Sequence, residues 1–154
     1  MTLLLLALLI GVVAGLRAMT APAAVSWAAA AGWLQLDGSW LAFLGYRFTP
    51  WIVTVLAIVE LVTDQLPSTP SRKVPVQFGA RLVMGALSGA AIGIDGDMLV
   101  GGLVAGVVGA VLGTLGGAAA RGALAASFGS DRPAALIEDA VAILGALAIM
   151  AMLP

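Results

Sequence analysis

Cysteine and histidine are both absent from this chain of 154 residues. Without cysteine there is no disulfide and no thiolate chemistry, so the redox compartment cannot be inferred from the sequence. Without histidine there is no imidazole ligand and no side chain that ordinarily titrates near neutral pH. Zinc and copper favour sulfur and imidazole ligands, so we expect no metal site of that kind and no cofactor.

Charge is also scarce, since only 10% of the residues are charged and the net charge is -1. No basic run is present, which argues against a nucleic-acid partner and against a polybasic lipid-binding arm. Hydrophobic residues make up 62% of the chain and the mean hydropathy is +1.12, whereas a soluble domain has about 45–50% apolar residues. The lipid bilayer is therefore the expected partner, and residues 1–154 are predicted to form a single transmembrane domain.

Five apolar segments predict membrane-spanning helices, because backbone groups in lipid must be satisfied internally and the alternation typical of a β-barrel is missing. They cover residues 2–32, 50–66, 76–94, 98–120 and 133–153. The first is too long for one straight crossing, and Gly11, Gly15 and Pro22 predict bends, with a break near Arg17. The predicted fold class is an all-α polytopic bundle of about five spans whose first helix is kinked or broken.

The start of the chain admits a second interpretation. Residues 1–10 have the apolar character of a signal peptide, and residues 21–23 have small side chains typical of a cleavage site. No positive segment precedes the apolar run, which continues to residue 32. An uncleaved first span is therefore favoured.

The positions of the basic residues predict the orientation in the membrane. Arg72 and Lys73 lie in one predicted loop and Arg121 and Arg132 in another, whereas residues 95–97 carry only acidic charge. Cytoplasmic loops are enriched in Lys and Arg. With five spans, this predicts an N-terminus inside and a C-terminus outside. Aromatic residues before and within the second span predict an interfacial belt: Trp40, Tyr46 and Trp51.

Glycines recur at four-residue spacing in the third and fourth predicted spans. Each set lies on one helix face: Gly85, Gly89 and Gly93, then Gly102 and Gly106, then Gly109, Gly113 and Gly117. Such a face allows two helix backbones to approach closely. Packing within the monomer is the favoured interpretation, a homo-oligomer interface is the second and the lining of a pore is the third.

Six ionisable residues fall within the predicted spans: Arg17, Glu60, Asp64, Arg81, Glu138 and Asp139. A charge at the bilayer centre costs about 2.5–3.5 kcal/mol on insertion scales, so we expect these side chains to face the bundle interior, to pair or to line a polar path. Glu60 and Asp64 are one turn apart and share a helix face. Glu138 and Asp139 diverge by about 100°, so they are predicted to contact different neighbours and not to act together on one atom.

Two arginines among four carboxylates leave an excess of negative charge. Shared protons, a bound cation with oxygen ligands or a water-filled vestibule would compensate for it. A structural alternative is that the charges fix the register of paired helices. The segment 65–75, which has three prolines, adds hydroxyls at Ser68, Thr69 and Ser71 beside Arg72. They are predicted either to contact an anion or to form a solvated connector.

Two segments suggest an internal repeat, since residues 58–62 and 136–140 each place a glutamate among apolar residues. Arg17 and Arg121 likewise follow glycine-rich helices. With five spans, the first two would run opposite to the last two, as in inverted-repeat transporters. Glu60 and Glu138 would then be related by a pseudo-twofold axis near the midplane.

The motifs GLRAMTAP at 15–22, VELVTDQLP at 59–67 and LIEDAVA at 136–142 resemble a bacterial integral membrane family catalogued as domain of unknown function 4126. The likeness extends over nearly the whole chain, and Glu60, Asp64, Pro67, Glu138 and Asp139 match its pattern. Arg17 stands where asparagine is also expected in relatives. The resemblance implies a protein of the bacterial inner membrane and supplies no reaction.

The sequence therefore predicts a small transporter or channel-like protein, with a carboxylate-lined path for a cation, a proton or a small polar solute. Its path would be lined by the four carboxylates, with Arg17 and Arg81 as counter-charges, and its small size predicts a homo-oligomer. The alternative is an assembly protein whose glycine faces oligomerise. Catalysis is the weakest class, because no nucleophile–base pair and no phosphate-binding loop is present.

Overall fold

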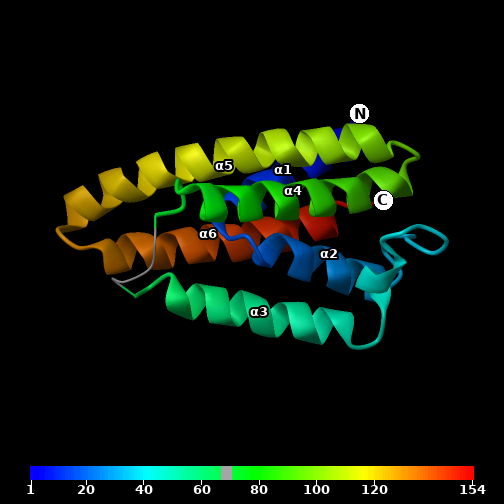
Figure 1. Cartoon of the computed structure of the whole chain (residues 1–154), viewed down its shortest axis with the longest axis horizontal. Helices are drawn as coiled ribbons and strands as arrows, with labels where there is room; N and C mark the ends of the chain where they lie inside the picture. The colour runs from blue at the N-terminus through cyan, green and yellow to red at the C-terminus, as the bar shows by residue number, and fades with distance from the viewer. Residues whose placement is uncertain (67–70) are drawn as a thin grey trace.

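A computed structural model describes residues 1–66 and 71–154 of the chain. The described residues form six α-helices and a short 3-10 helix, with no strand (Figure 1). The elements are α1 (Thr2–Leu16), α2 (Thr20–Ala30), η1 (Ala42–Gly45), α3 (Thr49–Thr63), α4 (Pro75–Asp95), α5 (Leu99–Phe128) and α6 (Asp131–Ala151). Pro67, Ser68 and Thr69, which were singled out in the sequence, lie outside the described residues.

The predicted first span is two helices that form a hairpin. Helix α1 runs parallel to α5, since Leu4 lies beside Gly101 and Gly15 lies beside Gly113. Helix α2 returns in the opposite direction, and every later helix reverses again (Figure 1). Both termini consequently lie at the same end of the bundle (Figure 1), whereas the five-span layout placed them on opposite sides of the membrane.

The reversal changes which helices could be paired in the predicted inverted repeat. Helices α3 and α6 run in opposite directions, as the repeat requires, but α1 and α5 are parallel (Figure 1). Glu60 and Glu138 both face the interior, but at one end of the bundle. The five-span layout treated α1 and α2 as one span. The turn at Arg17 reverses the chain between them, so α1 runs in the opposite direction to α2 (Figure 1).

The expected bend points have other roles. Gly11 and Gly15 lie within continuous α1 and face the backbone of α5. Pro22 lies in the first turn of α2, where a missing backbone N–H costs no intrahelical hydrogen bond. Only residues 17–19 separate the two helices, and Arg17 has extended backbone angles, with φ -141° and ψ 111°.

The centre of the bundle is formed by glycine contacts among α1, α4 and α5. A Cβ added at Gly89 or Gly106 would lie less than 3 Å from backbone atoms of the facing helix. The same holds for Gly93, Gly102, Gly109 and Gly113, whereas a Cβ at Gly117 would meet side chains of Leu16, Arg72 and Glu138. These faces are therefore used within one chain, and a second copy could pack against them only if the bundle opened.

Among the described residues, three helices are long and apolar enough to cross a membrane, namely α4, α5 and α6. Helices α1 and α3 are apolar but shorter, with 15 residues each. Helix α5 has 30 residues and continues beyond the predicted end at 120 to Gly129, whose positive φ of 73° ends it. At 1.5 Å per residue α5 is about 45 Å long, so it extends beyond a hydrocarbon core of about 30 Å or tilts within it.

Helix α3 lies at the edge of the bundle. It packs chiefly against α2 and η1 through Pro50, Val53 and Ala57, and Trp27 of α2 contacts Trp51 edge-to-face with ring centroids 4.9 Å apart. Apart from the partly buried Leu61, the remaining apolar side chains of α3 are exposed: Trp51, Ile52, Val55, Leu56, Ile58, Val59 and Val62. The exposed Trp33, Trp40 and Tyr46 lie in the connection between α2 and α3, at the end of the bundle that carries both termini (Figure 1).

Candidate functional site

The turn between α1 and α2 exposes the ends of two helices inside the bundle. The last carbonyls of α1 accept hydrogen bonds from Arg81, whose Nη1 lies 2.9 Å from the Gly15 oxygen and 2.8 Å from the Leu16 oxygen. A cation is favourable at a helix C-terminus because the peptide dipoles place negative charge there. Arg81 is 3% exposed. Its hydrogen bonds satisfy carbonyl groups that have no N–H partner within α1.

The start of α2 is capped by the opposite charge. The backbone N–H groups of Ala18 and Met19 donate to the two carboxylate oxygens of Glu60, each at 2.7 Å. This pairing satisfies the N–H of the N-cap residue Met19 and that of the residue before it, and it places negative charge at the positive end of the dipole. Glu60 therefore joins α3 to the hairpin turn.

Arg17 at the hairpin turn is fully buried and contacts three carboxylates. Its Nε donates to Asp139 Oδ1 at 2.6 Å, and its Nη1 lies 3.1 Å from Glu138 Oε2 and 3.3 Å from Asp64 Oδ2. Gln65 donates to the other oxygen of Asp139 at 2.9 Å. The guanidinium thus connects the hairpin turn to α3 and α6.

Two further arginines enter this site that the sequence placed only in loops. Arg72 binds both oxygens of Glu138, with Nη2 2.7 Å from Oε2 and Nη1 paired with Oε1. Arg121 lies 3.3 Å from Glu138 Oε2 and 2.6 Å from Asp131 Oδ2, and its Nη2 donates to the backbone oxygen of Asp64 at 3.2 Å. The sequence contained one indication that Arg72 and Arg121 enter the site, namely the excess of negative charge within the predicted spans.

We define the charged cluster by the eight described side chains that meet here: Arg17, Glu60, Asp64, Arg72, Arg81, Arg121, Glu138 and Asp139. It contains four positive and four negative groups. Arg72 and Arg121 compensate the excess of negative charge among the six residues of the predicted spans, and Arg121 also pairs with the exposed Asp131. The charge balance gives no reason for a bound cation, and within residues 1–66 and 71–154 no group of acidic side chains is placed to hold a metal ion.

Each of the two acidic pairs converges on one arginine. Glu60 and Asp64 share a helix face and both approach Arg81 Nη2, at 4.0 and 3.8 Å. Glu138 and Asp139 bind different nitrogens of Arg17. Their other neighbours differ, since Glu138 pairs with Arg72 and Arg121 and Asp139 accepts a hydrogen bond from Gln65. A long guanidinium between two diverging carboxylates can bind both, which a 100° separation on the helix does not prevent.

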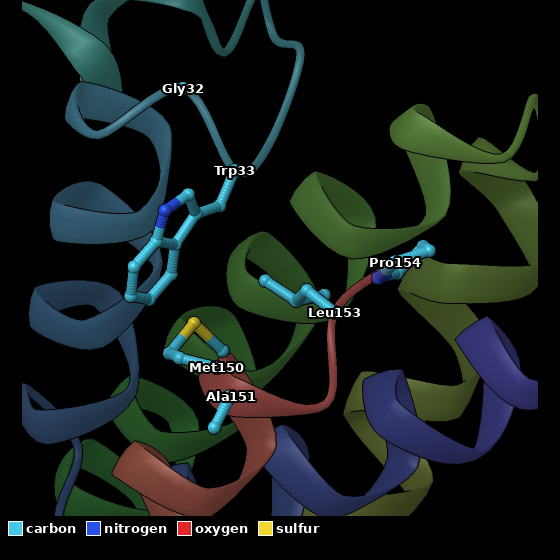
Figure 2. A pocket seen from close by; sticks show the side chains of 6 residues that line it. All are labelled: Gly32, Trp33, Met150, Ala151, Leu153 and Pro154. Carbon is cyan, nitrogen blue, oxygen red and sulfur yellow. The ribbon is translucent and has the colours of Figure 1, made fainter.

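A pocket of about 300 Å³ lies at the opposite end of the bundle. Figure 2 shows Trp33 and Met150 pointing toward one another across it, with Leu153 at its side. Its remaining lining residues are Gly32, Ala151 and Pro154. None of them belongs to the charged cluster, so this pocket and the cluster are separate features.

The fold and the cluster together indicate the class of protein. An all-helical chain with three helices long and apolar enough to cross a membrane is a candidate membrane protein. No family model, no curated protein and no solved structure matches the chain. The resemblance to domain of unknown function 4126 accordingly stays a prediction.

Proposed function

We propose that the chain is a small transporter or channel-like protein of a bacterial inner membrane, with the charged cluster at one end of its path for a small polar solute. The observation that carries the proposal is the meeting of eight charges at a helix break within the bundle. Intramembrane charges usually mark substrate or ion pathways, and discontinuous helices with exposed ends bind substrates in several transporter folds. Fewer charges would suffice to fix a helix pair.

In the proposed path, the ion pairs of the charged cluster close one end. A solute would pass by replacing an internal partner of an arginine or a carboxylate, because the cluster is balanced without it. Helix α3 is the element best placed to move, since it carries Glu60 and Asp64 and packs mainly on α2 and η1.

Flux measurements in proteoliposomes test the proposal. A panel of inorganic ions, carboxylates and small polar solutes is expected to include one whose uptake exceeds that of empty liposomes. Glu138→Gln should reduce this uptake by about tenfold or more, because Arg17, Arg72 and Arg121 lose the shared carboxylate that positions them for a solute. The exposed Asp37→Asn should leave uptake unchanged. Unaltered uptake in a folded Glu138→Gln protein would contradict the proposal, as would the absence of any transported solute.

The second candidate is a structural role, favoured by the pairing of every carboxylate in the cluster with an arginine. In this case the charges fix the hairpin turn, and Glu138→Gln lowers stability without any associated flux. The glycine faces no longer support the assembly form of this hypothesis, because Gly109 packs against Leu8 and Val12 of the same chain. A homo-oligomer would need another surface.

We also propose that the basic end of the bundle faces the cytoplasm. Arg72 and Lys73 precede α4, Arg121 lies in the last part of α5 and Arg132 at the start of α6, and these segments meet at one end of the bundle (Figure 1). The turn between α4 and α5, at residues 95–97, lies at the other end. Both termini then lie outside. Reporters that are active only outside the cytoplasm should work when fused to either terminus and fail when inserted after Lys73. Activity at one terminus alone would contradict this topology and would support an odd number of crossings.

A further inference from the structure

We infer that the N-terminus of α2 is a carboxylate-binding site that the chain itself fills with Glu60, and that a ligand carboxylate displaces Glu60 from it. The inference rests on the proposed function and names its substrate class. The site is formed by the Ala18 and Met19 N–H groups and by the guanidinium of Arg81.

The present occupant shows which chemistry the site accepts. Each Glu60 oxygen receives one backbone N–H at 2.7 Å, so the two donors are spaced for one carboxylate. Helix α2 has 11 residues and its dipole favours an anion at this end. A ligand carboxylate would reproduce the same two hydrogen bonds.

Buried donors that Glu60 does not use provide independent support. Within the described part of the chain, Arg81 Nε and Thr20 Oγ1 have no hydrogen-bond partner, although these residues are 3% and 8% exposed. The guanidinium of Arg81 faces Glu60, but its Nη2 remains 4.0 Å from Oε1, beyond hydrogen-bond distance. Thr20 is the first residue of α2. A free carboxylate, which is not tethered to α3, can approach the guanidinium of Arg81 more closely.

The attachment of α3 allows the exchange. The outer face of α3 is exposed, and its buried contacts, Pro50, Val53 and Ala57, lie in the part of the helix before Glu60. When Glu60 withdraws, the rest of the charged cluster has four arginines and three carboxylates. The resulting positive charge favours an anion over a cation or a neutral solute.

Chemical rescue of Glu60→Ala tests the inference. In lipid-free detergent, this variant should melt below the wild type, and acetate should raise its melting temperature in a saturable manner. Sodium chloride at equal ionic strength and acetamide should not. Asp37→Ala is the matched control and should show no acetate effect. Rescue should weaken when Thr20→Val is added. A folded Glu60→Ala protein that responds equally to acetate and chloride would overturn the inference.

Glu60→Gln provides the second measurement if the alanine variant does not fold. Its neutral amide competes less well for the site, so acetate should bind at least about tenfold more tightly than to the wild type. Equal affinity for both proteins would overturn the inference. Nanodiscs doped with oleate, compared with acetate in detergent, distinguish a lipid carboxylate from a free one. Rescue by acetate without any flux would contradict the proposed transport function and support the carboxylate-binding site. Flux of a neutral solute without rescue would support transport and contradict only the carboxylate-binding site.

Discussion

Arg17→Met is expected to lower the free energy of unfolding by about 3–5 kcal/mol, the range found when one partner of a buried ion pair is removed. Arg17 is 0% exposed and contacts Asp64, Glu138 and Asp139. Methionine preserves much of the length of the side chain but supplies no positive charge. The three carboxylates would remain buried with less compensation, and the turn between α1 and α2 would lose its attachment to α6.

Unfolding in detergent by titration with dodecyl sulfate, followed by circular dichroism, measures this effect. Arg132→Met is the matched control, because Arg132 is exposed near the start of α6, and it should change stability by less than about 0.5 kcal/mol. Similar losses in the two variants would show that the charged cluster does not stabilise the fold. In that event the ion pairs of Arg17 would be too weak to close the end of a path.

Gly106→Ala is expected to destabilise the protein by about 2–3 kcal/mol, through a backbone clash between helices. An added Cβ would lie less than 3 Å from the backbone of Gly85 on α4, and Gly11 of α1 approaches the same position. Because the contacting atoms belong to backbones, the helices themselves must separate. Alanine otherwise favours a helix over glycine by about 1 kcal/mol, so the measured loss is what remains after that gain.

The control is Gly116→Ala on the same helix. No atom lies within 4 Å of a Cβ added at Gly116, so this substitution should be neutral or slightly stabilising. The same unfolding measurement applies to both variants. A Gly106→Ala protein as stable as Gly116→Ala would contradict the close approach of α1, α4 and α5.

Much of the helical content follows from local patterns. The predicted segment 76–94 corresponds to α4, and 133–153 corresponds closely to α6, because long apolar runs bounded by charge and proline predict single helices. The length of α5 was underestimated, since Arg121 was taken as its end. Arginine is a good helix former, and its pairing with Asp131 and Glu138 allows the helix to continue to Gly129.

The candidate site was predicted only in part. The six charges within the spans were identified because their burial is costly, and all six lie in the charged cluster. Arg72 and Arg121 were missed because their distance along the chain from Glu138 gives no local signal of contact. The capping of α2 by Glu60 depends on a turn whose direction the sequence does not specify.

The sequence by itself determined that the chain is helical and apolar, which residues are costly to bury, and where the helices can pack closely. These properties depend on composition and on spacing along one helix. Tertiary structure alone decided that the break at Arg17 is a hairpin turn, that both termini lie at one end and that four arginines meet four carboxylates in the charged cluster. These features depend on contacts between helices that are distant in the sequence, where ion pairing and helix packing select one of several arrangements compatible with the same local pattern.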